Sequence, residues 1–258
     1  MILNINFIYG DTSTTVMDSF ENGLPRINRA ASGLTSCRRC QEQGSWQKAE
    51  DIWVDVWAVR LDTFTMEAAP GTVLVADERL AMAKFADRRL QSHYGRTHLC
   101  LRLLLSRYLD TSPEEIRLCR SQEGKPYLTC RSIQFNLSHA GGVALFAFCT
   151  DVPVGVDVEP VHSMSGASQI AARWFSQKEV DWIAASPQPE QAFLRCWVCR
   201  EAIGKASGLG LAHALKTNVL ECTQGALRSS EDFLLHEWEP WPGFRAAVAC
   251  APAGCIPA

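Results

Sequence analysis

Two carboxylates, Asp157 and Glu159, stand two residues apart in the otherwise apolar segment 154–159. If this segment is a β-strand, both side chains project from the same face, because successive side chains alternate between the two sides of a strand. The intervening Val156 and Val158 then point into a hydrophobic core. The pattern predicts a strand that presents two acidic groups together.

A third carboxylate lies in a helical pattern further along the chain. Trp197, Glu201 and Lys205 recur every four residues, which puts them on one face of a helix. Carboxylates from a strand and a helix that point together form an oxygen-rich site of the kind Mg²⁺ prefers. Lys205, one turn beyond Glu201, suits a phosphate that shares the metal. We predict a phosphate site in which Asp157, Glu159 and Glu201 bind Mg²⁺.

The overall composition allows a well-packed enzyme and argues against two other classes of protein. The chain has 258 residues with 47% hydrophobic content, enough to bury a core in one large domain or two lobes. A formal net charge of −3 gives no broad footprint for nucleic acid or for a membrane surface. No apolar run is long enough to span a bilayer. An anionic ligand must therefore meet local positive charge, and we expect a monomer.

The cysteines favour a reducing compartment. There are eleven, an odd number, and residues 1–10 lack the basic start and cleavage site of a secretory leader. We therefore expect reduced, mostly buried thiols and a cytoplasmic location. Cys37 and Cys40 have the CxxC spacing of redox and zinc sites. They lie in a polar stretch without strand or helix periodicity, so two incidental cysteines are the favoured interpretation.

Three regions differ in pattern. Residues 1–50 are polar and irregular, and indicate a poorly ordered or accessory segment. Residues 51–150 and 151–258 each run from helix into strands, which suggests two α+β lobes related by a pseudo-repeat. The long helical stretch 77–108 should break near Tyr94 and Gly95. We further expect strands at 53–59, 133–139, 143–148, 154–158 and 244–250, and helices at 170–175, 177–185 and 190–207.

Four motifs occur in the order and spacing of one enzyme family. They are Gly124–Pro126, Phe135–His139, Gly155–Glu159 and Trp197–Lys205, with Gly208–Leu211 following. In these residues the chain resembles the Sfp-type 4′-phosphopantetheinyl transferases, over roughly residues 52–250. The resemblance implies the α+β fold of that family, with two similar subdomains in a pseudo-twofold arrangement and the active site between them.

The resemblance also implies a reaction. Members of the family move the 4′-phosphopantetheine arm of coenzyme A onto a serine of an apo acyl or peptidyl carrier protein, and they release adenosine 3′,5′-bisphosphate. Mg²⁺ stabilises charge on the pyrophosphate. Two other classes stay open: another Mg²⁺-dependent phosphotransferase or phosphohydrolase, and a non-catalytic module that binds coenzyme A or a carrier protein. Which carrier or pathway the chain would serve is not legible in the sequence.

Site residues follow from the same match. Asp157, Glu159 and Glu201 would hold the metal, and Lys205 would neutralise a pyrophosphate oxygen. Glu201 is also our candidate for the base that takes the serine proton. The positions implied to contact the coenzyme A nucleotide are Arg96, Lys125, Ser138 and His139, and Lys84 could join them from the helix.

One departure concerns Arg200, which stands where the family more often has lysine. We expect it to face the surface and to affect catalysis little. Each acidic residue, taken alone, could instead be an ordinary exposed residue of a strand or of a surface helix pair. Trp197 is expected to pack in the core and to have no chemical role.

Overall fold

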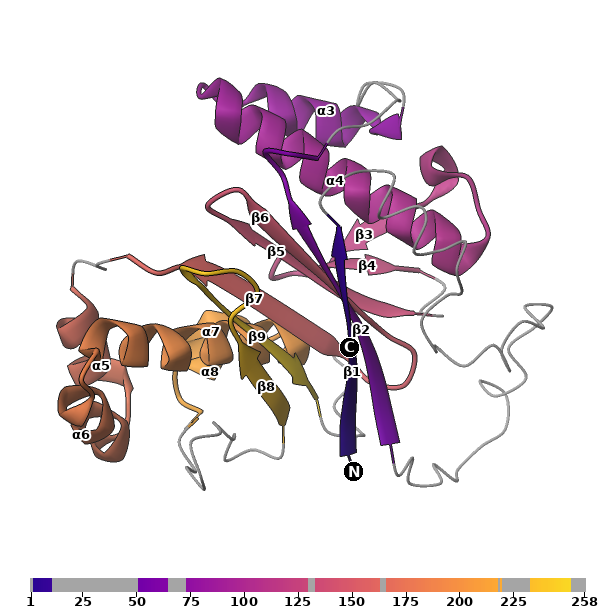
Figure 1. The fold of residues 1–258 in the computed structure, drawn as a ribbon. Coiled ribbons are helices and arrows are strands. Elements are labelled where there is room, and N and C mark those ends of the chain that lie inside the picture. Colours follow the sequence, from indigo (N-terminus) through magenta and orange to yellow (C-terminus); the bar gives the residue numbers. More distant parts are fainter. Residues whose placement is uncertain are drawn as a thin grey trace.

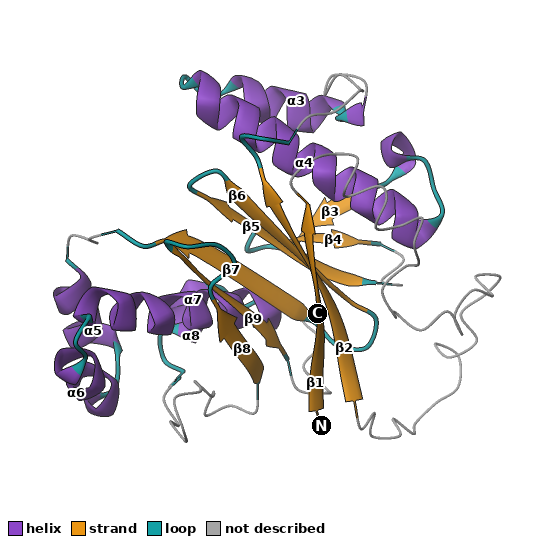
Figure 2. Cartoon of the chain, viewed as in Figure 1, coloured by secondary structure: helices purple, strands orange, loops and turns teal. Residues whose placement is uncertain are grey.

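The structure is a computed structural model, and it describes residues 2–10, 51–64, 73–129, 133–162, 166–217, 219 and 233–251. The N-terminal lobe comprises β1 (Ile2–Gly10), β2 (Asp51–Arg60), α3 (Ala76–Ala83), α4 (Arg88–Leu109), the 3-10 helix η3 (Pro113–Glu115), β3 (Leu118–Arg120), β4 (Pro126–Leu128), β5 (Gln134–Ala140) and β6 (Val143–Cys149). The C-terminal lobe comprises β7 (Val154–Pro160), α5 (Ala167–Trp174), α6 (Gln177–Ala185), α7 (Pro189–Ser207), α8 (Leu211–Ala214), β8 (Leu234–Trp238) and β9 (Phe244–Cys250). Helices α3 and α4 lie at one end of the molecule and α5–α8 at the other, with the sheets between them (Figures 1 and 2).

The sheet of the N-terminal lobe has the strand order β1-β2-β6-β5, in which β1 runs parallel to β2 and the other neighbours are antiparallel. Alternation divides the side chains of this sheet between two cores. Trp57 and Val59 pack with residues of α4, whereas Val56 and Ala58 face the second sheet. Because β2 lies between these two cores, it carries buried apolar side chains on both faces.

The second sheet has the order β7-β9-β8 and is antiparallel throughout. Val154, Val156 and Val158 of β7 pack against the first sheet, and all three are fully buried. The prediction that Val156 and Val158 point into a core is therefore confirmed. It follows that Asp157 and Glu159, at the alternate positions, face the other way, toward α7.

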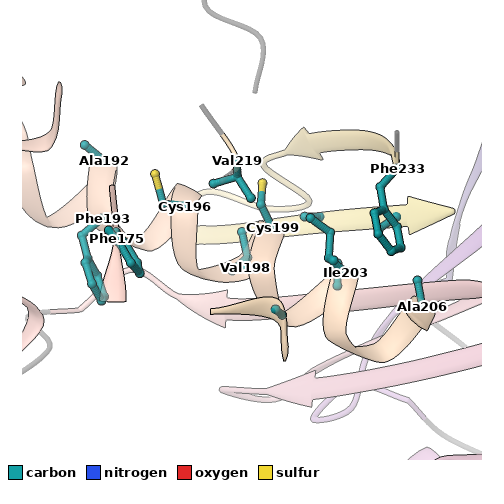
Figure 3. Close-up of a cluster of buried hydrophobic side chains, with 14 of the residues drawn as sticks. Phe175, Ala192, Phe193, Cys196, Val198, Cys199, Ile203, Ala206, Val219 and Phe233 are labelled. Carbon is teal, nitrogen blue, oxygen red and sulfur yellow. The ribbon is translucent and has the colours of Figure 1, made fainter. Parts of the chain in front are cut away.

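Helix α7 packs on the opposite face of the second sheet and forms the core of the C-terminal lobe. Figure 3 shows this cluster, in which Val198 and Ile203 of α7 lie with Phe175 and Val219. Most of α7 is buried, because the sheet, α6 and α8 all pack against it. The helix that carries Glu201 and Lys205 is thus held from several sides.

Residues 2–10 do not fit the expectation of an irregular N-terminal segment. Ile2–Gly10 is a strand, paired residue by residue with β2. The sequence does carry the signal, because Leu3 and Ile5 alternate with asparagines and pack against the inter-sheet core. Asn6 also donates a hydrogen bond of 2.8 Å to Asp55 on β2. The remainder of the segment, including Cys37 and Cys40, lies outside the described residues.

The predicted break near Tyr94 and Gly95 is wrong. The helices separate after Ala83 instead, and α4 begins after Asp87, whose side chain accepts hydrogen bonds from the backbone N–H groups of Arg89 and Leu90. Gly95 lies inside α4, and a Cβ there would come within 2.8 Å of Met82 Sδ, so α3 packs closely on α4 at this point. This glycine serves the close packing of α3 on α4 rather than a bend.

The other expected strands and helices are present to within a few residues at their ends, and the expected α+β fold of two lobes is confirmed. The six described cysteines are free thiols, five of them buried. No helix in the described part of the chain is long and apolar enough to cross a membrane.

Candidate active site

Strand β7 brings Asp157 and Glu159 to the helix that carries Glu201 and Lys205. The strand and the helix touch through their backbones at Gly155, where a Cβ would lie 2.1 Å from the carbonyl oxygen of Ala202. No other residue permits this approach. The glycine of the motif therefore sets the distance between the strand and the helix.

Lys205 is the centre of a hydrogen-bonded network. Its ammonium lies 2.6 Å from Asp157 Oδ1, 3.0 Å from Ser138 Oγ and 3.2 Å from the carbonyl oxygen of Val156. Ser138 in turn donates a hydrogen bond of 2.8 Å to Asp157 Oδ1. Asp157 is buried and Lys205 keeps 29% of its side chain exposed. The Lys205 side chain is thus partly accessible to a ligand.

Ser138 reaches this network from the other lobe. Strand β5 lies beside β7, and Asn136 Oδ1 accepts a hydrogen bond of 2.9 Å from the backbone N–H of Val156. Asn136 belongs to the motif Phe135–His139, but the sequence analysis did not assign it this role. The available signal was its position two residues before Ser138, on the same face of the strand. The site accordingly lies where β5, β7 and α7 meet, between the two lobes.

The three carboxylates form an acidic group that lacks enough positive charge. Burial and the Asp157 carboxylate raise the pKa of Glu159 to about 7, with a further contribution from Glu201 and opposition from Lys205. Burial and Asp157 likewise raise the pKa of Glu201, again against Lys205. Both pKa values rise because burial and the Asp157 carboxylate outweigh the opposing Lys205 charge.

These residues fit a divalent cation. Within the described residues, Asp157 Oδ2 is buried and has no hydrogen-bond partner, and an unsatisfied buried carboxylate oxygen is costly unless a cation binds it. No three His, Cys, Asp or Glu side chains of the described part converge into a ready-made metal cage. Mg²⁺ does not require one, since it commonly binds through one or two carboxylates and completes its shell with water and phosphate oxygens.

Beside the acidic group lies a cavity of about 250 Å³. Its wall includes Lys125, Asn136, Glu201 and Lys205. Lys125 comes from the turn before β4, and its ammonium donates to the backbone carbonyls of Val154, at 3.1 Å, and of Lys205, at 2.5 Å. Burial lowers the pKa of Lys125 to about 8. Its predicted contact with a nucleotide remains a prediction.

Arg96 lies on α4, away from the Lys205 network in the fold. Its guanidinium donates to the backbone carbonyls of Leu61 and Asp62, in the turn after β2. Arg89 and His93 lie on the same face of α4, and they contact the Asp62 carboxylate at 2.9 and 2.7 Å. The spacing of these basic residues at i, i+4 and i+7 was visible in the sequence and could have identified His93.

His139 and Lys84 complete the predicted set. His139 keeps an exposed surface on β5, yet the protein around its ring removes water, and this desolvation together with the positive charge of His98, Lys205 and His93 lowers its pKa. Charges from α4 (His93 and His98) and from α7 (Lys205) therefore both act on His139. Lys84 is exposed at the C-terminal end of α3. The structure thus joins Asp157, Ser138 and Lys205 by contact, whereas Lys84 stays on the α3 side.

Arg200 is not on the surface, so that prediction is wrong. It is fully buried, with its guanidinium 2.6 Å from Glu179 Oε1 and stacked over Phe175 at 3.8 Å. The reason is that α7 is covered on nearly all sides, and a buried charge requires a partner. Glu179 comes from another helix, so the helical pattern of α7 alone could not reveal the pair. Trp197 is half-buried and packs with Phe193, as expected.

Known proteins share both lobes. Residues 153–249 match the family model of the 4′-phosphopantetheinyl transferase superfamily, and residues 57–151 match that of the 4′-phosphopantetheinyl transferase N-terminal region. The 4′-phosphopantetheinyl transferase HetI of Nostoc sp. is 30% identical over 215 residues, which cover 79% of this chain and 90% of that protein.

Animal relatives match as well. The L-aminoadipate-semialdehyde dehydrogenase-phosphopantetheinyl transferase of Xenopus laevis is 29% identical over 84% of this chain and 74% of that protein. The mouse protein of the same name is 30% identical over 54% of this chain, which spans about half (49%) of its length. Both lobes and the motifs at their junction therefore have counterparts in one family. The chain belongs to the 4′-phosphopantetheinyl transferase superfamily, and it is a transferase of that class.

Proposed function

We propose that the protein transfers 4′-phosphopantetheine from coenzyme A to a serine of an apo acyl or peptidyl carrier protein, in a Mg²⁺-dependent reaction that releases adenosine 3′,5′-bisphosphate. The observation that carries this proposal is the network of Lys205, Asp157 and Ser138 beside two further carboxylates. It combines a partly exposed cation for phosphate with an acidic group suited to a metal.

The chain's own residues divide the chemistry between them. Asp157, Glu159 and Glu201 would hold Mg²⁺, which when bound would supply positive charge to the pyrophosphate. Lys205, whose side chain is partly exposed, binds a pyrophosphate oxygen. Glu201 would take the proton of the attacking serine hydroxyl, because α7 places it one turn before Lys205 and beside the other two carboxylates.

The nucleotide end of coenzyme A needs positive charge elsewhere, because a dense anion enters a protein of net charge −3. Arg96 and His139 lie on the N-terminal lobe side of the site, with Lys84 further out. We assign nucleotide binding to these residues together with Ser138 and Lys125. The buried free thiols support a reducing, cytoplasmic setting for this reaction.

The test is intact-mass measurement of apo carrier proteins after incubation with the protein, coenzyme A and Mg²⁺. A panel of fatty-acid, polyketide, nonribosomal-peptide and aminoadipate-pathway carriers covers the substrates of the family. We expect the mass of one phosphopantetheine on at least one carrier, and loss of transfer when the metal is chelated. Absence of added mass on every carrier contradicts the proposal, and phosphoester hydrolysis without a carrier would indicate a phosphohydrolase.

Variants tie the reaction to the acidic group. Asp157→Ala and Glu201→Ala should each lower the rate of transfer by about two to three orders of magnitude, since a bound metal contributes several kcal/mol to catalysis. Glu190→Ala is the matched control, because Glu190 is an exposed acid in the first turn of the same helix. Near-normal turnover in both site variants would refute the metal assignment.

A further inference from the structure

Strand β9 places an arginine directly opposite one of the three acidic site residues. Arg245 is the register partner of Glu159 on β7, and Ala247 is the partner of Asp157. Residues directly opposite each other in an antiparallel pair point to the same face of the sheet. Ala247 packs in the core under α7, so Glu159 and Arg245 also lie on the α7 side of the sheet.

Opposite charges at such positions attract each other across the strands, and an ion pair is the expected arrangement. Among the described residues, however, no cationic side chain forms an ion pair with Glu159. Lys205 pairs with Asp157, and both ion pairs of Arg245 go to acids outside the site. The orientation of Arg245 therefore requires a cause.

The partners of Arg245 lie on the side away from Glu159. Its guanidinium donates a hydrogen bond of 3.0 Å to Gln191 Oε1 in the first turn of α7. It also forms ion pairs with Glu239, in the turn after β8, and with Glu237 on β8, at 3.4 and 3.9 Å. Only 21% of the side chain is exposed, so these contacts, and not free solvent, surround it.

The two glutamates are themselves fixed by other donors. Arg195 of α7 donates 3.0 Å to Glu237 Oε2, which leaves Oε1 facing Arg245. The backbone N–H of Gly243 donates 3.1 Å to Glu239 Oε1, which leaves Oε2 for Arg245. Each acceptor is thus held in place before Arg245 binds to it.

An arginine that paired with Glu159 would compete with a metal ion. A guanidinium can occupy both oxygens of a carboxylate at once, and Mg²⁺ binds through the same oxygens. Two cations on one carboxylate would also repel each other. The acidic group can therefore bind a divalent cation most strongly when Arg245 is directed elsewhere.

We propose that the acceptors around Arg245 keep its guanidinium out of the metal site and thereby leave the Glu159 carboxylate to a divalent cation. Gln191, Glu237 and Glu239 are in this sense positioning residues. The inference rests on the proposed function, because it takes Glu159 as a metal ligand. It predicts that loss of these acceptors weakens metal binding only while the arginine is present.

The experiment combines Gln191→Leu with Glu239→Gln. The leucine removes the amide acceptor, whereas the glutamine keeps an oxygen for Gly243 N–H and removes the negative charge. Glu237 then remains at 3.9 Å, and it is already paired with Arg195. Electron paramagnetic resonance of free Mn²⁺ gives the Kd of the metal with coenzyme A present and no carrier, so that no turnover occurs.

We expect the Kd of Mn²⁺ to rise by about threefold to fivefold in this double variant, because a cross-strand ion pair must be broken before the metal binds. In an Arg245→Met background the same two substitutions should change the Kd by no more than about 1.5-fold. General damage to the site would persist without the arginine, and a released arginine would not. Glu190→Gln removes an exposed acid from the same turn of α7 and controls for the loss of charge.

An equal rise in Kd with and without the arginine overturns the proposal, and so does an unchanged Kd in the double variant. If the double variant does not fold, the comparison is made with Glu239→Gln alone. In the transfer assay the KM for Mg²⁺ should rise, with kcat at saturating Mg²⁺ close to the wild-type value. Normal transfer without the Mn²⁺ effect refutes this inference alone, whereas the Mn²⁺ effect without transfer to any carrier refutes the proposed function.

Discussion

In the N-terminal lobe Arg102 of α4 forms a buried ion pair with Glu78 of α3 at 2.7 Å, and in the C-terminal lobe Arg200 of α7 pairs with Glu179 of α6 at 2.6 Å. Each glutamate also accepts a hydrogen bond from a backbone N–H at the start of its own helix, that of Val75 or Ser176. Each lobe thus ties its long helix to a shorter preceding helix through one buried Arg–Glu pair.

The surroundings of the two pairs differ. Arg102 also donates to the carbonyls of Pro113 and Ile116, at 2.7 and 3.2 Å, so backbone oxygens share its charge. Arg200 lies over the Phe175 ring, and its Nε is buried without a hydrogen-bond partner among the described residues. The C-terminal pair depends more on its glutamate than the N-terminal pair does.

The position of Arg200 on α7 links this difference to the candidate active site. Arg200 directly precedes Glu201, so the C-terminal pair anchors the turn of α7 that carries an acidic site residue. Glu179 also accepts from the backbone N–H of Val219, at 3.0 Å, and so fixes the chain beyond α8. The Arg102–Glu78 pair therefore stabilises the N-terminal lobe, whereas the Arg200–Glu179 pair also supports the candidate active site.

The largest expected effect is that of Glu179→Ala. This change leaves Arg200 buried without its carboxylate and should lower the free energy of unfolding by about 3–5 kcal/mol. Urea denaturation followed by tryptophan fluorescence measures the loss, with the exposed Glu190→Ala as control. A loss no larger than that of the control would mean that the pair does not anchor α7.

Glu78→Ala should be the milder of the two carboxylate deletions. Arg102 retains two backbone acceptors, so we expect a loss of about 2–3 kcal/mol in the free energy of unfolding. The same denaturation experiment ranks the two variants directly. If Glu78→Ala is the more destabilising, the contrast between the lobes is wrong.

Replacing each arginine by lysine should reverse this order, so that the change in the N-terminal lobe is the more destabilising one. Lysine cannot reproduce the fork with which Arg102 reaches Glu78 and two carbonyls, so Arg102→Lys should lower the free energy of unfolding by about 2 kcal/mol. Arg200→Lys keeps the main ion pair and loses the stacking on Phe175, at about 1 kcal/mol. Equal losses in the two variants would show that the side-chain geometry does not matter.

The smallest expected effect is a difference in how stability depends on pH. It distinguishes the ion-paired Glu78 and Glu179 from Glu159 of the candidate active site. Burial would raise the pKa of Glu78 and Glu179, but the His98 ring at 3.5 Å and a hydrogen bond from Arg102 in one case, and the Arg200 charge in the other, lower it. Their stabilisation is therefore present above the unfolded-state pKa and is lost as the pH falls through the lower folded value.

Glu159 has the opposite sign, because its folded pKa of about 7 lies above its ordinary value of 4.5. Between these values the folded state binds more protons than the unfolded state, so stability from this group falls as the pH rises. In metal-free buffer, Glu159→Gln should therefore gain stability relative to wild type between about pH 5 and pH 7. A difference that does not change with pH would contradict the raised pKa.

Local patterns sufficed for much of the site. The alternation around Asp157 and Glu159 and the four-residue spacing of Glu201 and Lys205 depend only on the periods of a strand and a helix, and the structure has both. The N-terminal strand was missed because its two asparagines resemble loop composition, although its alternation is regular. Arg200 was misplaced because a helix buried on nearly all sides has no surface face for a charge to occupy.

The sequence by itself determined which residues could do chemistry and on which elements they lie, because these depend on neighbours a few positions apart. Only the tertiary structure decided that Ser138 meets Asp157 and Lys205, that Glu179 partners Arg200, and that Lys125 crosses to the end of α7. Each of these contacts joins segments at least 19 residues apart. Such contacts arise when the lobes pack, and no local period encodes them.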